Sequence, residues 1–309
     1  MFVLAHLSDP HLSAIPRPRL SELAGKRALG LVNWQLRRRH EHRAEVLDAL
    51  LDDLAAQEPD HIAVTGDLVN VALPGEFASA RAFLSRLGPP EAVSFVPGNH
   101  DAYVRAALAH SHAHWRHYLA GDEAEPDAAA PTFPYLRRRG PVVLIGVSTA
   151  LPTGPFMATG RIGADQMKRL DHVLARLAKE DVFRVVLLHH PPTTRPGDRL
   201  KRLIDADSFR QVLRRHGAGL VLFGHIHMTS VTWLDGPECR IPAVSVASAS
   251  ATERGDEPAG YHLFRISAED GAWRCEMVTR GFAAGEAGIA ERRRCVLAPP
   301  PRAVTWAAR

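Results

Sequence analysis

Acidic and histidine side chains recur directly after short apolar runs along this chain of 309 residues. They stand in five short stretches, DPH, GD, GNHD, HH and GHIH. The residues concerned are Asp9, His11, Asp67, Asn99, His100, Asp101, His189, His190, His225 and His227. Carboxylate, amide and imidazole donors without cysteine suit Mn²⁺, Fe or Zn²⁺ in a catalytic site, and suit structural zinc or an iron–sulfur cluster poorly. The pattern therefore predicts a catalytic metal site.

The number of donors favours two metal ions over one. Seven of these residues are candidate ligands, and if one carboxylate bridges, they fit two ions roughly 3.5–4 Å apart. A single Asp-x-His motif at the end of a strand is more often a turn with a capping aspartate. Five such stretches, each at a predicted strand end, favour one shared site instead. Asp9 and His11 are expected to form one corner of it.

These side chains must be positioned by alternating apolar strands and amphipathic helices. Strands are expected at residues 3–9, 61–68, 92–99, 142–149, 184–190 and 220–227, and helices at residues 41–57, 75–87, 102–119, 164–178 and 207–215. The pattern then becomes all-β, with strands at 231–235, 241–250, 261–267 and 273–282. This order predicts a layered α/β core, with antiparallel strands completing a second sheet. The candidate ligands would then gather at the carboxyl ends of the strands, where open α/β sheets bind ligands.

Composition is that of an ordinary globular protein, with 46% hydrophobic and 23% charged residues. No run approaches the roughly 18 apolar residues of a membrane span. The first strand begins so early that no cleavable signal peptide is expected, and the three cysteines have no disulfide or metal spacing, so a cytoplasmic location is expected. One domain is expected over residues 1–282, followed by a peripheral and mobile tail over residues 283–309.

The ordered set DPH, GD, GNHD, LLHH and GHIH resembles the calcineurin-like metallophosphoesterase family. The resemblance spans about Val3 to His227, and the β-rich part up to about Phe282 fits the second sheet of that family. It implies a four-layer αββα sandwich of two mixed β-sheets flanked by helices. It also implies two metal sites that share Asp67 as the bridge. The first would consist of Asp9, His11, Asp67 and His227, and the second of Asp67, Asn99, His189 and His225, with His190 as a neighbour.

The resemblance further implies a metal-dependent phosphoric ester hydrolase with two divalent ions. The ions expected are Mn²⁺ or Fe, with Zn²⁺ as the alternative, and a hydroxide from a shared water would attack the phosphorus in line. His100 matches the family's histidine that stabilises the transition state and can protonate the leaving oxygen. Asp101 has two interpretations, as a partner that orients His100 or as the cap of the following helix.

Departures from other branches favour the bacterial phosphodiesterase branch, which includes cyclic-nucleotide and glycerophosphodiester hydrolases. Asn70 stands where purple acid phosphatases have a tyrosine, and the chain has GNHD where protein serine/threonine phosphatases have GNHE. The expected function is therefore hydrolysis of a phosphodiester. A non-catalytic scaffold is disfavoured, because such relatives lose ligands or the catalytic histidine, whereas this chain keeps all seven candidate ligands and His100.

A basic insert follows the first motif at about residues 13–43. Between Arg17 and Arg43 it carries eight Lys or Arg against Glu22 and Glu41, although the whole chain carries a net charge of only +4. Leucines mix with these charges, as in an interfacial helix. The segment 17–43 could bring the site to an anionic membrane surface on the cytoplasmic side, as in the family's pyrophosphate hydrolases of UDP-diacylglucosamine, or it could fold back on its own domain with a solvated basic face. Nucleic acid is not an expected partner, and a nuclease is disfavoured, since Trp34 is the insert's one aromatic residue.

Overall fold

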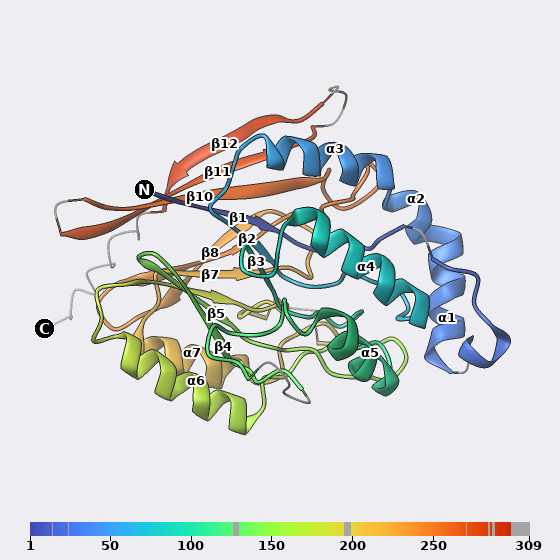
Figure 1. The fold of residues 1–309 in the computed structure, drawn as a ribbon, viewed down its shortest axis with the longest axis horizontal. Coiled ribbons are helices and arrows are strands. Elements are labelled where there is room, and N and C mark those ends of the chain that lie inside the picture. Colours follow the sequence, from blue (N-terminus) through green and yellow to red (C-terminus); the bar gives the residue numbers. More distant parts are fainter. Residues whose placement is uncertain are drawn as a thin grey trace, which may run out of the picture.

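Two six-stranded mixed sheets pack face to face, with helices on both outer faces (Figure 1). The computed structural model describes residues 1–13, 15–23, 25–125, 130–194, 199–269, 271–283, 285 and 288–297. The first sheet runs in the order β12 (Ala290–Val296), β11 (Ala272–Gly281), β10 (Gly260–Glu269), β1 (Phe2–Leu7), β2 (His61–Val64) and β3 (Val93–Phe95). The second runs in the order β4 (Tyr135–Arg139), β5 (Val142–Gly146), β6 (Phe183–Leu187), β7 (Leu220–Phe223), β9 (Arg240–Ser245) and β8 (Ser230–Asp235).

The helices complete the four layers. The outer face of the first sheet is covered by α3 (Ala44–Ala55) and α4 (Pro74–Leu87), and that of the second by α6 (Ala164–Leu177) and α7 (Ala206–His216) (Figure 1). Helix α5 (Arg105–Trp115) packs beside α4. The predicted αββα sandwich of two mixed sheets is therefore confirmed.

Apolar side chains fill three layers, because most strands are buried on both faces. In β1, Phe2 and Leu4 point into the layer between the sheets, whereas Ala5 and Leu7 point toward α3 and α4. Side chains alternate in this way along every strand. Strands buried on both sides read as continuous apolar runs, which is why they were recognisable in the sequence.

The C-terminal strands are distributed differently from the expectation. Only β8 and β9 extend the second sheet, whereas β10 and β11 join the first sheet beside β1, with Leu4 opposite Phe264. The expectation that the antiparallel strands all complete the second sheet is therefore wrong. The physical reason lies in β1, which pairs with β2 on one edge only and would leave its other edge unpaired without β10.

Two strands of the structure, β4 (Tyr135–Arg139) and β12 (Ala290–Val296), were not predicted from the sequence. Strand β4, with the sequence YLRRR, follows a segment expected to be a loop, and its Arg137 is buried because it donates to the carbonyl groups of Ala120 and His117 at 2.8 and 2.7 Å. Strand β12 lies within the expected tail but pairs with β11 from Glu276 to Gly281, so this part of the tail belongs to the first sheet. Their arginines made both segments look unlike strands. The end of the tail, residues 298–309, lies outside the described residues.

The basic insert folds back on the domain as a helical segment at one end of the sandwich (Figure 1). It comprises a 3₁₀ turn η1 (Leu20–Leu23), α1 (Lys26–Asn33), a π-helical turn η2 (Trp34–Arg38) and α2 (Arg39–Glu41). Gly30 lets α1 approach the domain, since a Cβ there would overlap the Tyr103 hydroxyl. Lys26 Nζ also donates to Thr153 Oγ1 at 2.9 Å. None of the helices in the described ranges has the length and apolar character that a membrane span requires.

Candidate functional site

All seven predicted ligands meet at one end of the sandwich. Each lies within four residues of the end of a strand. Backbone hydrogen bonds join the loops of one sheet, such as Asp9 N to Gly66 O at 3.0 Å and Gly224 N to His189 O at 3.1 Å, and Ala249 N to Ser8 O at 2.9 Å joins the two sheets. The strands that deliver them are β1 for Asp9 and His11, β2 for Asp67, β3 for Asn99, β6 for His189, and β7 for His225 and His227. The sequence order of the motifs thus becomes a single cluster in space.

Four of these side chains form a first group around His11 Nε2. This nitrogen lies 3.2 Å from His227 Nε2, 3.9 Å from Asp9 Oδ1 and 3.8 Å from Asp67 Oδ2. His227 Nε2 also lies 3.2 Å from Asp9 Oδ1. Donor atoms of four residues therefore surround one small space.

A second group surrounds His189 Nε2. It lies 3.4 Å from Asp67 Oδ2, 3.2 Å from Asn99 Oδ1 and 3.2 Å from His225 Nδ1. The ring is oriented by its other nitrogen, because Nδ1 donates to the carbonyl oxygen of Thr65 at 2.6 Å. That bond makes Nε2 the nitrogen that faces Asp67 and that would bind a cation, as at histidine metal ligands. Asp67 Oδ2 belongs to both groups.

The donor set fits divalent cations. Two ligand atoms about 2.1 Å from one cation, at ordinary coordination angles, stand about 3.0–3.4 Å apart. Five of the distances within the two groups are 3.2–3.4 Å, and the two from His11 Nε2 to the carboxylates are longer, at 3.8 and 3.9 Å. Asp9 Oδ1 is buried and has no hydrogen-bond partner in the described part of the chain, although His227 Nε2 is 3.2 Å away. A buried carboxylate oxygen next to an imidazole nitrogen is a pair of donor atoms that a bound cation could join.

The backbone at these residues is strained in a consistent way. Eight described residues other than glycine have a positive φ, and five of them are Asp9, His11, Asp67, His225 and His227, with φ between 37° and 71°. Left-handed conformations cost free energy for such residues and concentrate at functional sites. Gly98 shows how tightly the loops pack, since a Cβ there would overlap the Asp67 carboxylate.

The electrostatics are dominated by the buried Asp67. Burial acts to raise the pKa of its carboxyl group, but His189 and His100 hold that pKa well below its usual range. Burial acts to lower the pKa of His189, yet Asp67 raises it to about 9. An ionised carboxylate at the centre of the cluster is the charge that a cation would neutralise.

His100 lies beside the cluster and faces the pocket. Its backbone N–H donates to Asp67 Oδ1 at 2.8 Å, and its ring Nδ1 lies 2.5 Å from the carbonyl oxygen of Asn70. The Tyr103 ring stacks on it at a centroid distance of 5.5 Å. Burial and the nearby Arg38 lower the pKa of His100 to about 3.

Asp101 is placed differently from both interpretations of the sequence. Its carboxylate accepts hydrogen bonds from the backbone N–H groups of Asp67, Leu68 and Gly98, at 2.8 to 2.9 Å, and does not contact the His100 ring. It does not cap α5 either, whose N-cap residue is Val104 without a side-chain bond. Burial and the negative charge of Asp67 raise the pKa of Asp101 to about 7. Asp101 thus holds the loops that present Asp67 and Asn99.

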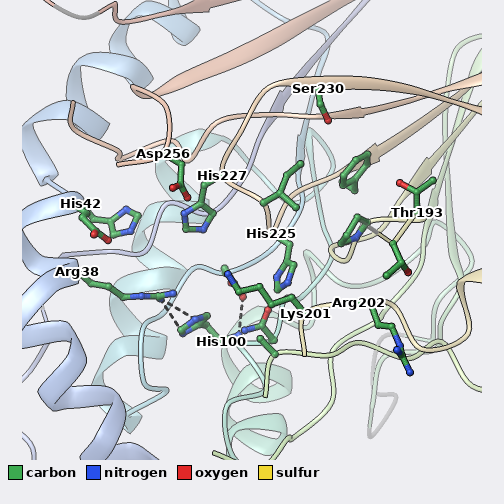
Figure 2. Close-up of a pocket in the computed structure, with 18 of the residues that line it drawn as sticks. Arg38, His42, His100, Thr193, Lys201, Arg202, His225, His227, Ser230 and Asp256 are labelled. Carbon is green, nitrogen blue, oxygen red and sulfur yellow. Dashed lines mark hydrogen bonds between the residues drawn. The ribbon is translucent and has the colours of Figure 1, made fainter. Parts of the chain in front are cut away.

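Two residues of the insert reach the site and were missed in the sequence. Arg38 Nη1 donates to His100 Nε2 at 2.9 Å (Figure 2). The His42 ring lies 4.8 Å from the His11 ring, centroid to centroid. Both belong to the run RRRHEH, which looked like a solvated basic face because nothing in the sequence showed which of its side chains turn inward. The one indication in the sequence was position, because the insert starts directly after His11 and must therefore begin beside the site.

The site opens into a pocket of about 370 Å³. Figure 2 shows Arg38, His42 and Asp256 on one side of His225 and Thr193 and Arg202 on the other. Other histidines are not part of it. His190 is buried next to His225 and bonds Thr149 Oγ1 at 2.7 Å, while His110 and His114 of α5 stack on Phe77.

Comparison with known proteins agrees with this arrangement. The family model described as calcineurin-like phosphoesterase matches residues 2–229. A probable cyclic nucleotide phosphodiesterase from Synechococcus sp. is 25% identical over 238 residues, which cover 74% of this chain and 80% of that protein.

Solved structures share the fold at low sequence identity. A dimetal phosphatase from Danio rerio is 14% identical, with a TM-score of 0.62 and coverage of 97% of this chain and 99% of that one. The purple acid phosphatase from yellow lupin (Lupinus luteus) seeds is 12% identical, with a TM-score of 0.58 and coverage of 93% and 53%. The match of the family model over most of the chain shows that the protein belongs to the calcineurin-like phosphoesterase family and is a metal-dependent phosphoric ester hydrolase.

Proposed function

We propose that the protein is a phosphodiesterase that works with two divalent metal ions. The observation that carries the proposal is the pair of donor groups that share Asp67 Oδ2, one around His11 and one around His189. The similarity to a probable cyclic nucleotide phosphodiesterase supports a diester over a monoester. The pocket of about 370 Å³ is within the size range of small-ligand sites.

The ligand sets follow from the two groups. One ion would be held by Asp9, His11, Asp67 and His227, and the other by Asp67, Asn99, His189 and His225. The nitrogen and oxygen donors suit Mn²⁺ or Fe, with Zn²⁺ as the alternative. When bound, such ions supply charge neutralisation for phosphate oxygens and lower the pKa of a water toward neutrality.

The chain's own residues have separate tasks around these ions. Asp101 fixes the loops that carry Asp67 and Asn99, and Thr65 fixes the ring of His189. His100 lines the pocket with its ring held by the Asn70 carbonyl through Nδ1, and its Nε2 is the nitrogen that Arg38 contacts. We assign His100 to stabilise the charge that develops on the phosphoryl oxygens and the leaving oxygen.

The substrate class can be tested with two chromogenic esters. We expect Mn²⁺-loaded protein to hydrolyse bis(p-nitrophenyl) phosphate faster than p-nitrophenyl phosphate, and to lose this activity with EDTA. Recovery of the activity on adding back Mn²⁺ is the control. That result would justify a screen of cyclic nucleotides and glycerophosphodiesters, whereas a preference for the monoester, or activity that resists chelation, would contradict the proposal.

A second candidate is a membrane-peripheral hydrolase of a lipid-linked pyrophosphate, with the protein on the cytoplasmic side. It is favoured by exposed apolar side chains on the insert, which lies beside the pocket. Leu20 is 90% exposed and Leu36 76% exposed, and Leu29 and Val32 are also exposed. The exposed Arg37 and Arg39 lie among them. Apolar side chains mixed with cations are typical of surfaces that bind anionic lipid.

Vesicle binding separates the two candidates. If the second holds, the protein should sediment with vesicles containing phosphatidylglycerol, less so at 0.5 M NaCl, because salt screens the attraction of arginines to the lipid. The double variant Val32→Ser, Leu36→Ser should reduce this binding several-fold, whereas Val296→Ser, which removes an exposed side chain from β12, should not. Equal and weak sedimentation with neutral and anionic vesicles would exclude the membrane candidate.

A further inference from the structure

Among the described arginines of the insert, only Arg38 has a side chain that hydrogen-bonds the proposed catalytic residue His100. It lies at the end of η2 and reaches across the pocket mouth to His100 (Figure 2). Its Nη1 lies 2.9 Å from His100 Nε2 and 3.5 Å from Nδ1. The neighbouring Arg37 instead pairs with Glu41 at 2.8 Å and is exposed.

The contact fixes the state of the His100 ring. The Asn70 carbonyl oxygen, 2.5 Å from Nδ1, can only accept a hydrogen bond, so Nδ1 carries the proton. A guanidinium group can only donate, so Nε2 presents its lone pair to Arg38. While this contact lasts, Arg38 occupies the ring nitrogen that faces the pocket.

A guanidinium group binds a neutral imidazole more weakly than it binds an anionic oxygen. Nε and Nη2 of Arg38 have no hydrogen-bond partner within the described part of the chain. Burial lowers the pKa of Arg38, and only the more distant charges of groups such as Asp67 oppose that effect. Hydrogen bonds from a guanidinium to an anionic oxygen are about twice as strong as neutral ones. Arg38 is therefore a cation with spare donors, held at the pocket with no carboxylate of the described residues bonded to it.

The backbone of Arg38 is held in place. The His42 N–H donates to the Arg38 carbonyl at 3.0 Å, and the next residue, Arg43, donates from its N–H to Ser250 O at 3.0 Å. The His42 ring also bonds Ser250 Oγ at 2.9 Å. The insert is thus fixed to the loop after β9, and only the side chain of Arg38 has to move for it to change partner.

We propose that Arg38 is a substrate-binding residue, which exchanges His100 Nε2 for a non-bridging oxygen of the phosphodiester when the substrate enters. This inference rests on the proposed function and deepens it, because it makes the insert part of the active site. The exchange gives the guanidinium an anionic partner and leaves His100 Nε2 without the guanidinium beside it, so that this nitrogen can take up a proton from water and donate it to the phosphoryl group. The planar fork of arginine can bind two phosphate oxygens, which lysine cannot.

The test compares Arg38→Ala, Arg38→Lys and the control Arg86→Ala, which removes a surface ion pair with Asp48 and Asp52. Binding of inorganic phosphate to the Mn²⁺-loaded proteins is measured by calorimetry, together with kcat and KM for bis(p-nitrophenyl) phosphate. We expect Arg38→Ala to bind phosphate about 10-fold more weakly and to lose about 10²-fold in kcat/KM. Added guanidinium ion should restore part of the rate, and Arg38→Lys should recover only part of both.

The outcomes separate this inference from the proposed function. Unchanged phosphate affinity in Arg38→Ala, with wild-type Mn²⁺ content and melting temperature, would overturn the role of Arg38, as would a wild-type protein that binds no phosphate. If wild-type protein binds phosphate but does not hydrolyse the diester, the proposed function fails, while the phosphate comparison still decides the role of Arg38. If Arg38→Ala does not fold, Arg38→Gln, which keeps the length without the charge, decides the same question.

Discussion

Replacing Asp67 with alanine is expected to remove metal binding and activity together. Asp67 Oδ2 lies 3.8 Å from His11 Nε2 and 3.4 Å from His189 Nε2, so this one oxygen serves both donor groups. Its loss leaves Asp9 as the one carboxylate of the first group and only neutral ligands in the second, with much less negative charge to hold cations. We expect Asp67→Ala to retain less than one Mn²⁺ per chain after desalting, and to lose at least about 10³-fold in kcat/KM. Elemental analysis and diester hydrolysis on the same samples measure both effects.

Two further variants make this result specific. Asp67→Asn keeps an acceptor for the His100 N–H but removes the charge, so it should lose metal affinity with little change in the melting temperature of the metal-free protein. Asp171→Ala removes a carboxylate from a surface ion pair with Arg215 and should keep full metal content. If Asp67→Ala kept two ions per chain, the assignment of Asp67 as the shared ligand would be wrong.

Replacing His100 with alanine should have the opposite pattern, with metal retained and the rate lost. The ring is not among the ligands proposed for either ion, although it lies near His11 and Asp67, and the bond from the residue 100 backbone N–H to Asp67 Oδ1 persists in the variant. Removal of a side chain that stabilises charge or transfers a proton in the transition state typically costs about 10²–10⁴-fold. We expect a fall of that size in kcat, with KM changed by less than about 10-fold.

The control for His100→Ala is His114→Ala, which removes a ring stacked on Phe77 away from the pocket. It should keep wild-type kcat. His100→Ala with a wild-type rate on the diester would show that this ring takes no part in catalysis. Loss of metal in His100→Ala would instead show that the ring supports the cluster itself.

The sequence predicted the strands and the site correctly where an apolar run is followed directly by polar residues. Apolar runs buried on both faces marked β1, β2, β3, β5, β6 and β7, and the polar residues that follow them marked the site. The signals were local, because the turn that exposes Asp9 or His225 is encoded by residues next to it. Topology then brings these turns together, as open α/β sheets do at their carboxyl ends.

The sequence was uninformative where long-range contacts decide the outcome. Strand β4 forms because Arg137 finds carbonyl acceptors in residues 90–120, and β12 forms because β11 offers it an edge. Arg38 turns inward whereas Arg37 turns outward, although both belong to one arginine run. That difference is set by the attachment of His42 to Ser250, more than 200 residues away in sequence. No local pattern carries such information.

The number of metal ions that the active protein binds tests the shared role of Asp67 most directly. Metal-free protein is titrated with Mn²⁺ by calorimetry, while hydrolysis of bis(p-nitrophenyl) phosphate is measured at each equivalent. We expect the protein to bind two ions per chain and to reach full activity only when the second is bound, because Asp67 Oδ2 links the two donor groups. Saturation of activity at a single equivalent, or activity in metal-free protein, would contradict it.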